Sequence, residues 1–151
     1  MGLTVEIPNE YGFVVLTTVS TFFLNSWHAL LVGRHRKAAQ VPYPNLYASA
    51  EACKTSQEAY SFNCAQRAHG HLLENFTPVV GSMLIAGVSY PITTSVLGLG
   101  WIVGRVLFAK GYTSEKLGGN GKGRYKGIFY ALFQFGLFGL AGWSGVQMLL
   151  A

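Results

Sequence analysis

The sequence predicts an all-α membrane protein, a bundle of four transmembrane helices. The scarcity of charge and its distribution predict the helices. Of the 151 residues, 50% are hydrophobic and 11% are charged, whereas a soluble domain carries about 25% charged residues. So few charges cannot cover the surface of an ordinary soluble domain, and the apolar content excludes a disordered chain. The length allows one domain, residues 1–151.

Three stretches contain no charged residue: Tyr11–Gly33, Asn75–Gly104 and Gly127–Ala151. A spanning helix needs about 20 mainly apolar residues, so the first and third stretches fit one span each. The middle stretch fits two spans if both extend beyond it, with a tight turn at Val88–Pro91. The predicted spans are about 11–33, 64–88, 91–110 and 126–149. A soluble bundle is the alternative, but the apolar runs lack amphipathic spacing.

The basic residues predict the orientation of the spans. All eleven Lys and Arg residues fall within 34–67 and 105–126, around the first and third connections. The positive-inside rule places both connections in the cytoplasm and both termini across the membrane. This distribution explains the basic balance without a nucleic-acid partner. The two cysteines, Cys53 and Cys64, lack the His or acidic spacing of a metal site.

Polar residues concentrate at the start of the second span, in FNCAQRAHGHLLE (Phe62–Glu74). Four of them, spaced by four, four and three, share one face of the predicted helix: Asn63, Arg67, His71 and Glu74. Ionisable groups at a membrane boundary are costly and usually face a bundle interior or a watery cavity. A solvated helix end is the alternative. The set suits a zwitterionic ligand, with Arg for a carboxylate and Glu for an ammonium.

Three further arginines lie on the same predicted side of the membrane: Arg36, Arg105 and Arg124. A pocket with four arginines and one glutamate predicts a polyanionic ligand that carries one amine. Binding of lipid headgroups is the alternative, because basic residues beside spans commonly contact them.

Three segments, in order along the chain, resemble motifs of the MAPEG superfamily (membrane-associated proteins in eicosanoid and glutathione metabolism). They are VGRHRKAAQVPYPNLYAS (Val32–Ser49), FNCAQRAHGHLLE and GRVLFAKGY (Gly104–Tyr112). Within the superfamily, the chain is most similar to the type 3 microsomal glutathione transferases. The resemblance covers nearly the whole chain. It implies a homotrimer, with the co-substrate glutathione bound between neighbouring subunits at the cytoplasmic end.

The resemblance also implies roles for individual residues. The expected glutathione contacts are Arg36, Asn63, Arg67, His69, His71, Glu74, Arg105, Phe108 and Tyr112. His71 stands where the family usually has Asn, and Phe108 stands where relatives have Tyr, so one hydroxyl contact is lost. Arg124 is the expected thiol-activating residue, with Lys122 or Arg105 as alternatives.

The mechanism that follows is electrostatic. The thiolate is the nucleophile, yet the thiol of glutathione is mostly protonated at neutral pH. A guanidinium beside the sulfur favours the anion. The predicted function is a membrane glutathione transferase or glutathione-dependent peroxidase that acts on lipophilic electrophiles or lipid hydroperoxides. A non-catalytic lipid- or glutathione-binding membrane protein of the same family is the alternative. The implied location is the endoplasmic reticulum, with the outer mitochondrial membrane left open.

Overall fold

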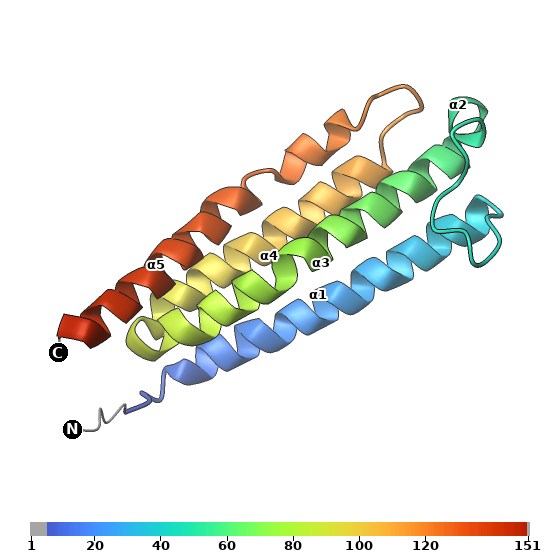
Figure 1. Ribbon diagram of the computed structural model, residues 1–151. Coiled ribbons are helices and arrows are strands. Elements are labelled where there is room, and N and C mark those ends of the chain that lie inside the picture. Colours follow the sequence, from blue (N-terminus) through green and yellow to red (C-terminus); the bar gives the residue numbers. More distant parts are fainter. Residues whose placement is uncertain (1–5, 151) are drawn as a thin grey trace.

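A computed structural model describes residues 6–150, and within them four long helices form an up-and-down bundle (Figure 1). The long helices are α1 (Tyr11–Ala38), α3 (Gln57–Ser89), α4 (Pro91–Thr113) and α5 (Tyr130–Leu150). The connections contain α2 (Ala52–Thr55) and a 3-10 helix, η1 (Lys122–Gly127). The described part of the chain contains no strand. The all-α prediction is therefore confirmed.

Three of these helices, α1, α3 and α4, are long and apolar enough to cross a membrane. The remaining long helix, α5, has 21 residues and no charged residue. Four glycines and two glutamines lower its apolar content. The count of four spans therefore stays a prediction.

The connection between α3 and α4 is a single residue. Tyr90 has φ −133° and ψ 59°, outside the helical region, and Pro91 occupies the first position of α4. Proline fits there because the first turn of a helix needs no backbone donor from it. At its other end α3 is capped by Ser56, whose side chain accepts a hydrogen bond from the backbone N–H of Ala59 at 3.2 Å.

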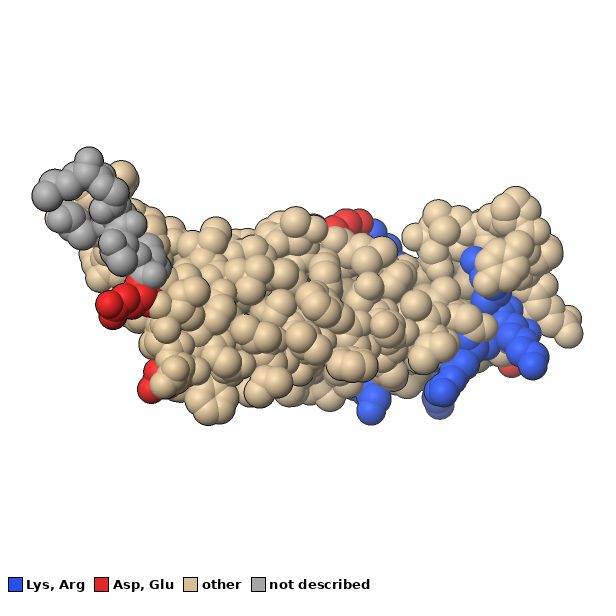
Figure 2. All heavy atoms as spheres, turned by 90° about the horizontal axis from the view of Figure 1, so that it is seen from below, with Lys and Arg blue, Asp and Glu red and all other residues tan. Residues whose placement is uncertain are grey.

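All four long helices contribute to one apolar core. Its buried members are Leu24, Leu72, Val79, Met83, Trp101 and Leu137. The helix α3 packs against each of the other three. We call the end that carries connections 39–56 and 114–129 the loop end. Most Lys and Arg side chains gather there, away from the end where α1 begins (Figure 2).

Candidate functional site

A cavity of about 450 Å³ lies at the loop end, between α3, α4, η1 and α5. Its lining residues are Arg67, His71, Phe108, Tyr112, Arg124, Tyr125, Ile128 and Tyr130. The fold thus brings Arg67 of α3 and Arg124 of η1, which are far apart in the sequence, to the walls of one cavity. Five of the residues that the sequence marks as site candidates line it.

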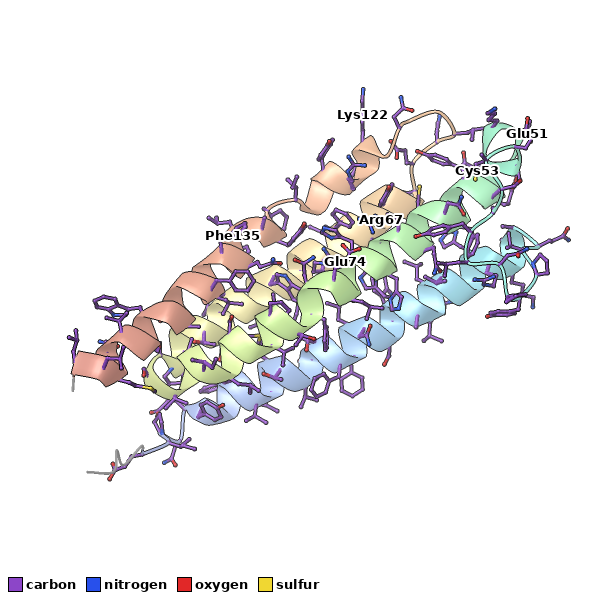
Figure 3. All side chains as sticks on the ribbon, viewed as in Figure 1. Glu51, Cys53, Arg67, Glu74, Lys122 and Phe135 are labelled. Atoms are coloured by element: carbon purple, nitrogen blue, oxygen red, sulfur yellow. The ribbon has the colours of Figure 1, made fainter. Side chains whose placement is uncertain are left out.

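Arg67, which lines the cavity, forms an ion pair with Glu74, which does not line it. Arg67 Nη1 lies 2.8 Å from Glu74 Oε1, and the two side chains are 49% and 54% exposed. They lie beside each other on α3, as the helical spacing predicts (Figure 3). Because both groups are half exposed, a charged ligand could replace either partner of the ion pair with little loss of free energy.

Arg105 is fully buried next to the cavity. Its Nη1 lies 2.8 Å from Nδ1 of His71, and its Nη2 donates to the carbonyl of Ala68 at 3.3 Å. A guanidinium has only donors, so His71 Nδ1 must accept. The proton of a neutral His71 therefore sits on Nε2, which leaves one N–H donor for another partner.

Aromatic rings enclose this arginine. The Arg105 guanidinium carbon lies 5.0 Å from the ring centre of Phe108 and 4.7 Å from that of Tyr130. The imidazole of His71 stacks on Phe108, with ring centres 5.5 Å apart. Cation–π contacts stabilise a desolvated guanidinium. Arg105 therefore holds His71 and the cavity wall in place rather than lining the cavity itself.

Arg124 enters the cavity from η1. Its Nη2 donates to the Tyr125 hydroxyl at 3.3 Å, and its guanidinium carbon lies 5.8 Å from the ring centre of Tyr112. The hydrogen bond to Tyr125 raises the pKa of the Arg124 guanidinium, so the group stays charged. Lys122 belongs to the same short helix, but it does not line the cavity and projects away from Arg67 (Figure 3).

The position of η1 is fixed by close packing and by α3. A Cβ on Gly127 would meet backbone atoms of Gly104 and Phe108, so η1 approaches α4 closely only because these residues leave room. The hydroxyl of Tyr60 accepts from the backbone N–H of Gly121 at 3.0 Å and donates to Glu115 at 3.2 Å. These contacts set where Arg124 lies.

The side chain of Asn63 is hydrogen-bonded to the first connection, residues 39–56. Its Oδ1 accepts from the backbone N–H of Ala48 at 2.8 Å, and its Nδ2 donates to the Ala48 carbonyl at 3.1 Å. Its Nδ2 also lies 3.0 Å from the sulfur of Cys53. Asn63 lines a neighbouring cavity of about 390 Å³, which shares Arg67 and Tyr112 with the first.

Two other candidates lie away from the cavity. Arg36 donates to the carbonyl of Asn45 at 2.7 Å and lies between the rings of Tyr43 and Phe62. His69 faces α1, where its ring centre lies 6.0 Å from that of His28. It is two residues from both Arg67 and His71, which places it on the opposite side of α3. Arg36 and His69 thus lie apart from the candidates that line the cavity.

Tyr125 and Tyr130 line the cavity, although neither is among the expected glutathione contacts. Tyr130 lies in an apolar run that the sequence predicts to be part of a span.

A partly buried chain of hydrogen bonds also supports the site. Trp101 Nε1 donates to Gln134 at 3.2 Å, Gln134 Nε2 to Asn75 at 2.8 Å, and Asn75 Nδ2 to the carbonyl of His71 at 2.9 Å. The only signal in the sequence was the presence of an amide side chain, Asn75 or Gln134, in each of the second and third uncharged stretches.

A sequence model of the MAPEG family matches residues 14–146, which contain all the candidate site residues. Three helices that could cross a membrane agree with the membrane-bound character of this family. The chain is therefore an integral membrane protein and belongs to the MAPEG family, which includes glutathione transferases, peroxidases, and leukotriene and prostaglandin synthases.

Proposed function

We propose that this protein is a membrane glutathione transferase with glutathione-dependent peroxidase activity, similar to the type 3 microsomal enzymes. Its second substrates are lipophilic electrophiles or lipid hydroperoxides. The observation that carries the proposal is the convergence of Arg67, Tyr112 and Arg124 on one cavity from three separate elements. The resemblance assigns all three to glutathione, and no spacing within one helix would bring them together.

The charges around the cavity fit glutathione, which has two carboxylates, one ammonium and one thiol. Arg67 suits a carboxylate, because guanidinium groups bind carboxylates bidentately. Glu74, which pairs with Arg67, suits the ammonium. His71 Nε2–H offers one donor where relatives have an amide. The phenol of Tyr112 lines the same cavity and supplies a further hydrogen-bonding group.

Arg124 is proposed to stabilise the thiolate. It stays protonated, so it cannot remove the proton as a base, and the proton leaves to water. The charge of Arg124 lowers the free energy of the anion, which raises the fraction of nucleophile at neutral pH. In transfer, a carbon–sulfur bond forms and the leaving group departs. In peroxide reduction, two glutathiones become the disulfide while the hydroperoxide becomes an alcohol and water.

We also propose a homotrimer with the site between subunits. Arg36 and His69 lie away from the cavity that Arg67 and Arg124 line, so one subunit cannot offer all four to one ligand. A neighbouring subunit that packs its α1–α3 side against the cavity would bring its Arg36 and His69 towards the ligand. The basic loop end then faces the cytoplasm, in the endoplasmic reticulum or the outer mitochondrial membrane.

The test uses the purified full chain in detergent, with glutathione and either a chlorinated aromatic or an organic hydroperoxide. Loss of one stabilising group at the reacting atom typically costs about 100-fold in turnover, which we expect for Arg124→Ala. The ultraviolet absorbance of bound thiolate should fall with it. Lys122→Ala is the matched control and should retain activity, since Lys122 does not line the cavity.

Each outcome is informative. If Lys122→Ala loses turnover and Arg124→Ala does not, the assignment of the thiol-stabilising residue is wrong. If glutathione binds but neither substrate turns over, the protein is a non-catalytic binding member of the family. If glutathione does not bind at all, the proposed function fails.

A further inference from the structure

A groove runs lengthwise between α1 and α4, on another part of the bundle surface. It consists of two adjoining hollows of about 380 Å³ and 330 Å³, which share Ser20. Its wall on α1 extends from Phe13 to Trp27, and its wall on α4 extends from Ile92 to Lys110. On both helices the lining residues recur every three or four positions, so each wall is one continuous stripe.

The groove is separate from the glutathione cavity. Phe108 lines that cavity, whereas Lys110 lines the groove. Two residues along an α-helix correspond to a rotation of about 200°. The body of α4 therefore stands between the two sites, and none of the lining residues is shared.

The walls of the groove are apolar in effect. Its three hydroxyl side chains, Thr17, Ser20 and Ser95, each donate at 2.8 Å to a backbone carbonyl four residues earlier in their own helix. Hydroxyl groups satisfied in this way have little left to offer a polar ligand. Among the described residues that line the groove, Lys110 is the only charged one.

Lys110 lies at the loop-end limit of the groove, in the last turn of α4. From Ile92 to Lys110 the helix rises about 27 Å, close to the hydrocarbon thickness of about 30 Å. A ligand that follows the groove is therefore apolar across the membrane and meets one cation at its boundary. The aliphatic stem of a lysine can lie along such a surface while its ammonium reaches the polar region.

We propose that this groove binds one long-chain fatty acid, with its carboxylate at Lys110 and its acyl chain along α1 and α4. A single ammonium matches a monoanion, whereas recognition of phosphate in a fork geometry favours arginine. The groove has one stripe of lining residues on each helix, which matches the path of a single acyl chain. This site is independent of glutathione and of the proposed catalysis.

Trp27, in the groove wall, allows a direct test. Dibromostearate, whose bromines quench indole fluorescence, is added to the full chain in nanodiscs of neutral phosphatidylcholine. The background is Trp143→Phe, because Trp143 is 52% exposed while Trp101 is fully buried. Dibromostearate should quench Trp27 at lower membrane mole fraction than its uncharged methyl ester does.

Two variants separate the headgroup from the chain. One lysine near a membrane surface contributes about fivefold in affinity for an anion, so Lys110→Met should weaken dibromostearate by this factor and leave the ester unchanged. Lys116→Met, in the connection after α4, is the matched control and should change neither. Ser20→Phe, where the two hollows meet, should weaken both ligands.

Two results would overturn the proposal. Equal quenching by the acid and the ester would mean that the groove contacts ordinary bilayer lipid only. An unchanged acid affinity in Lys110→Met, with the fold intact by circular dichroism, would remove the assigned headgroup contact. Glutathione turnover should be unaffected by Lys110→Met. A loss of glutathione turnover in another variant therefore does not decide this test.

Discussion

Gly127→Ala tests how the position of η1 controls the site. The added Cβ would lie 2.7 Å from Cα of Phe108 and would also meet the carbonyl oxygen of Gly104. Ordinary contacts of this kind are 3.4–4 Å long, and the neighbouring atoms are backbone rather than flexible side chains. The short helix must therefore move away from α4 by roughly 1 Å, carrying Arg124 with it.

Overpacking of this kind costs about 1–3 kcal/mol of the free energy of unfolding. A shift of about 1 Å at a reacting group can lower turnover about 100-fold. We expect a melting temperature several degrees lower, unchanged helix content by circular dichroism, and this loss of glutathione turnover. Gly139→Ala is the matched control, because a Cβ there meets nothing within 4 Å. If both variants show wild-type stability and turnover, close packing does not position η1.

Three further variants probe single contacts. Glu74→Gln should leave the melting temperature unchanged, because its ion pair is half exposed. It should weaken glutathione binding about tenfold in calorimetry, and an unchanged affinity would remove Glu74 from the ligand site. Asn63→Ala leaves both backbone groups of Ala48 without their partner. It should lower unfolding free energy by about 1–3 kcal/mol and speed deuterium exchange in the first connection, whereas unchanged exchange would contradict this. Gln134→Leu leaves the indole N–H of Trp101 unpaired and should lower the free energy of unfolding by about 1–3 kcal/mol, measured by thermal unfolding. Wild-type stability in this variant would show that the bond is dispensable.

The helical architecture could be predicted because charge is excluded from membrane-depth segments. The same criterion could not give the helix ends. The helix α1 continues to Ala38 through basic residues, and α3 begins as early as Gln57. Basic residues in a last turn interact favourably with the helix C-terminus, and a Ser cap begins a helix wherever the chain supplies one. Hydropathy therefore predicts the apolar middle of each helix, while local capping decides its length.

Helical spacing could place Arg67 and Glu74 on one face, because that relation is local. It could not predict that Asn63, on the same face, is bound to Ala48, since this depends on the path of an irregular connection. Arg105 was expected to contact the ligand, but it is buried and bonded to His71. The depth of a side chain in a bundle depends on how its helix is rotated about its own axis. The few charged residues of this sequence do not determine that rotation.

The single-residue connection at Tyr90 has a consequence for biosynthesis. Because it is too short to let either helix move alone, α3 and α4 must enter the membrane together as one hairpin. The connections before α3 and after α4 are longer and polar, so they do not tie α1 or α5 to the hairpin in this way. The hydroxyl of Tyr90 donates to Gln147 of α5 at 2.7 Å. The turn of the hairpin is therefore fastened only once α5, which follows the hairpin in the chain, has packed beside it.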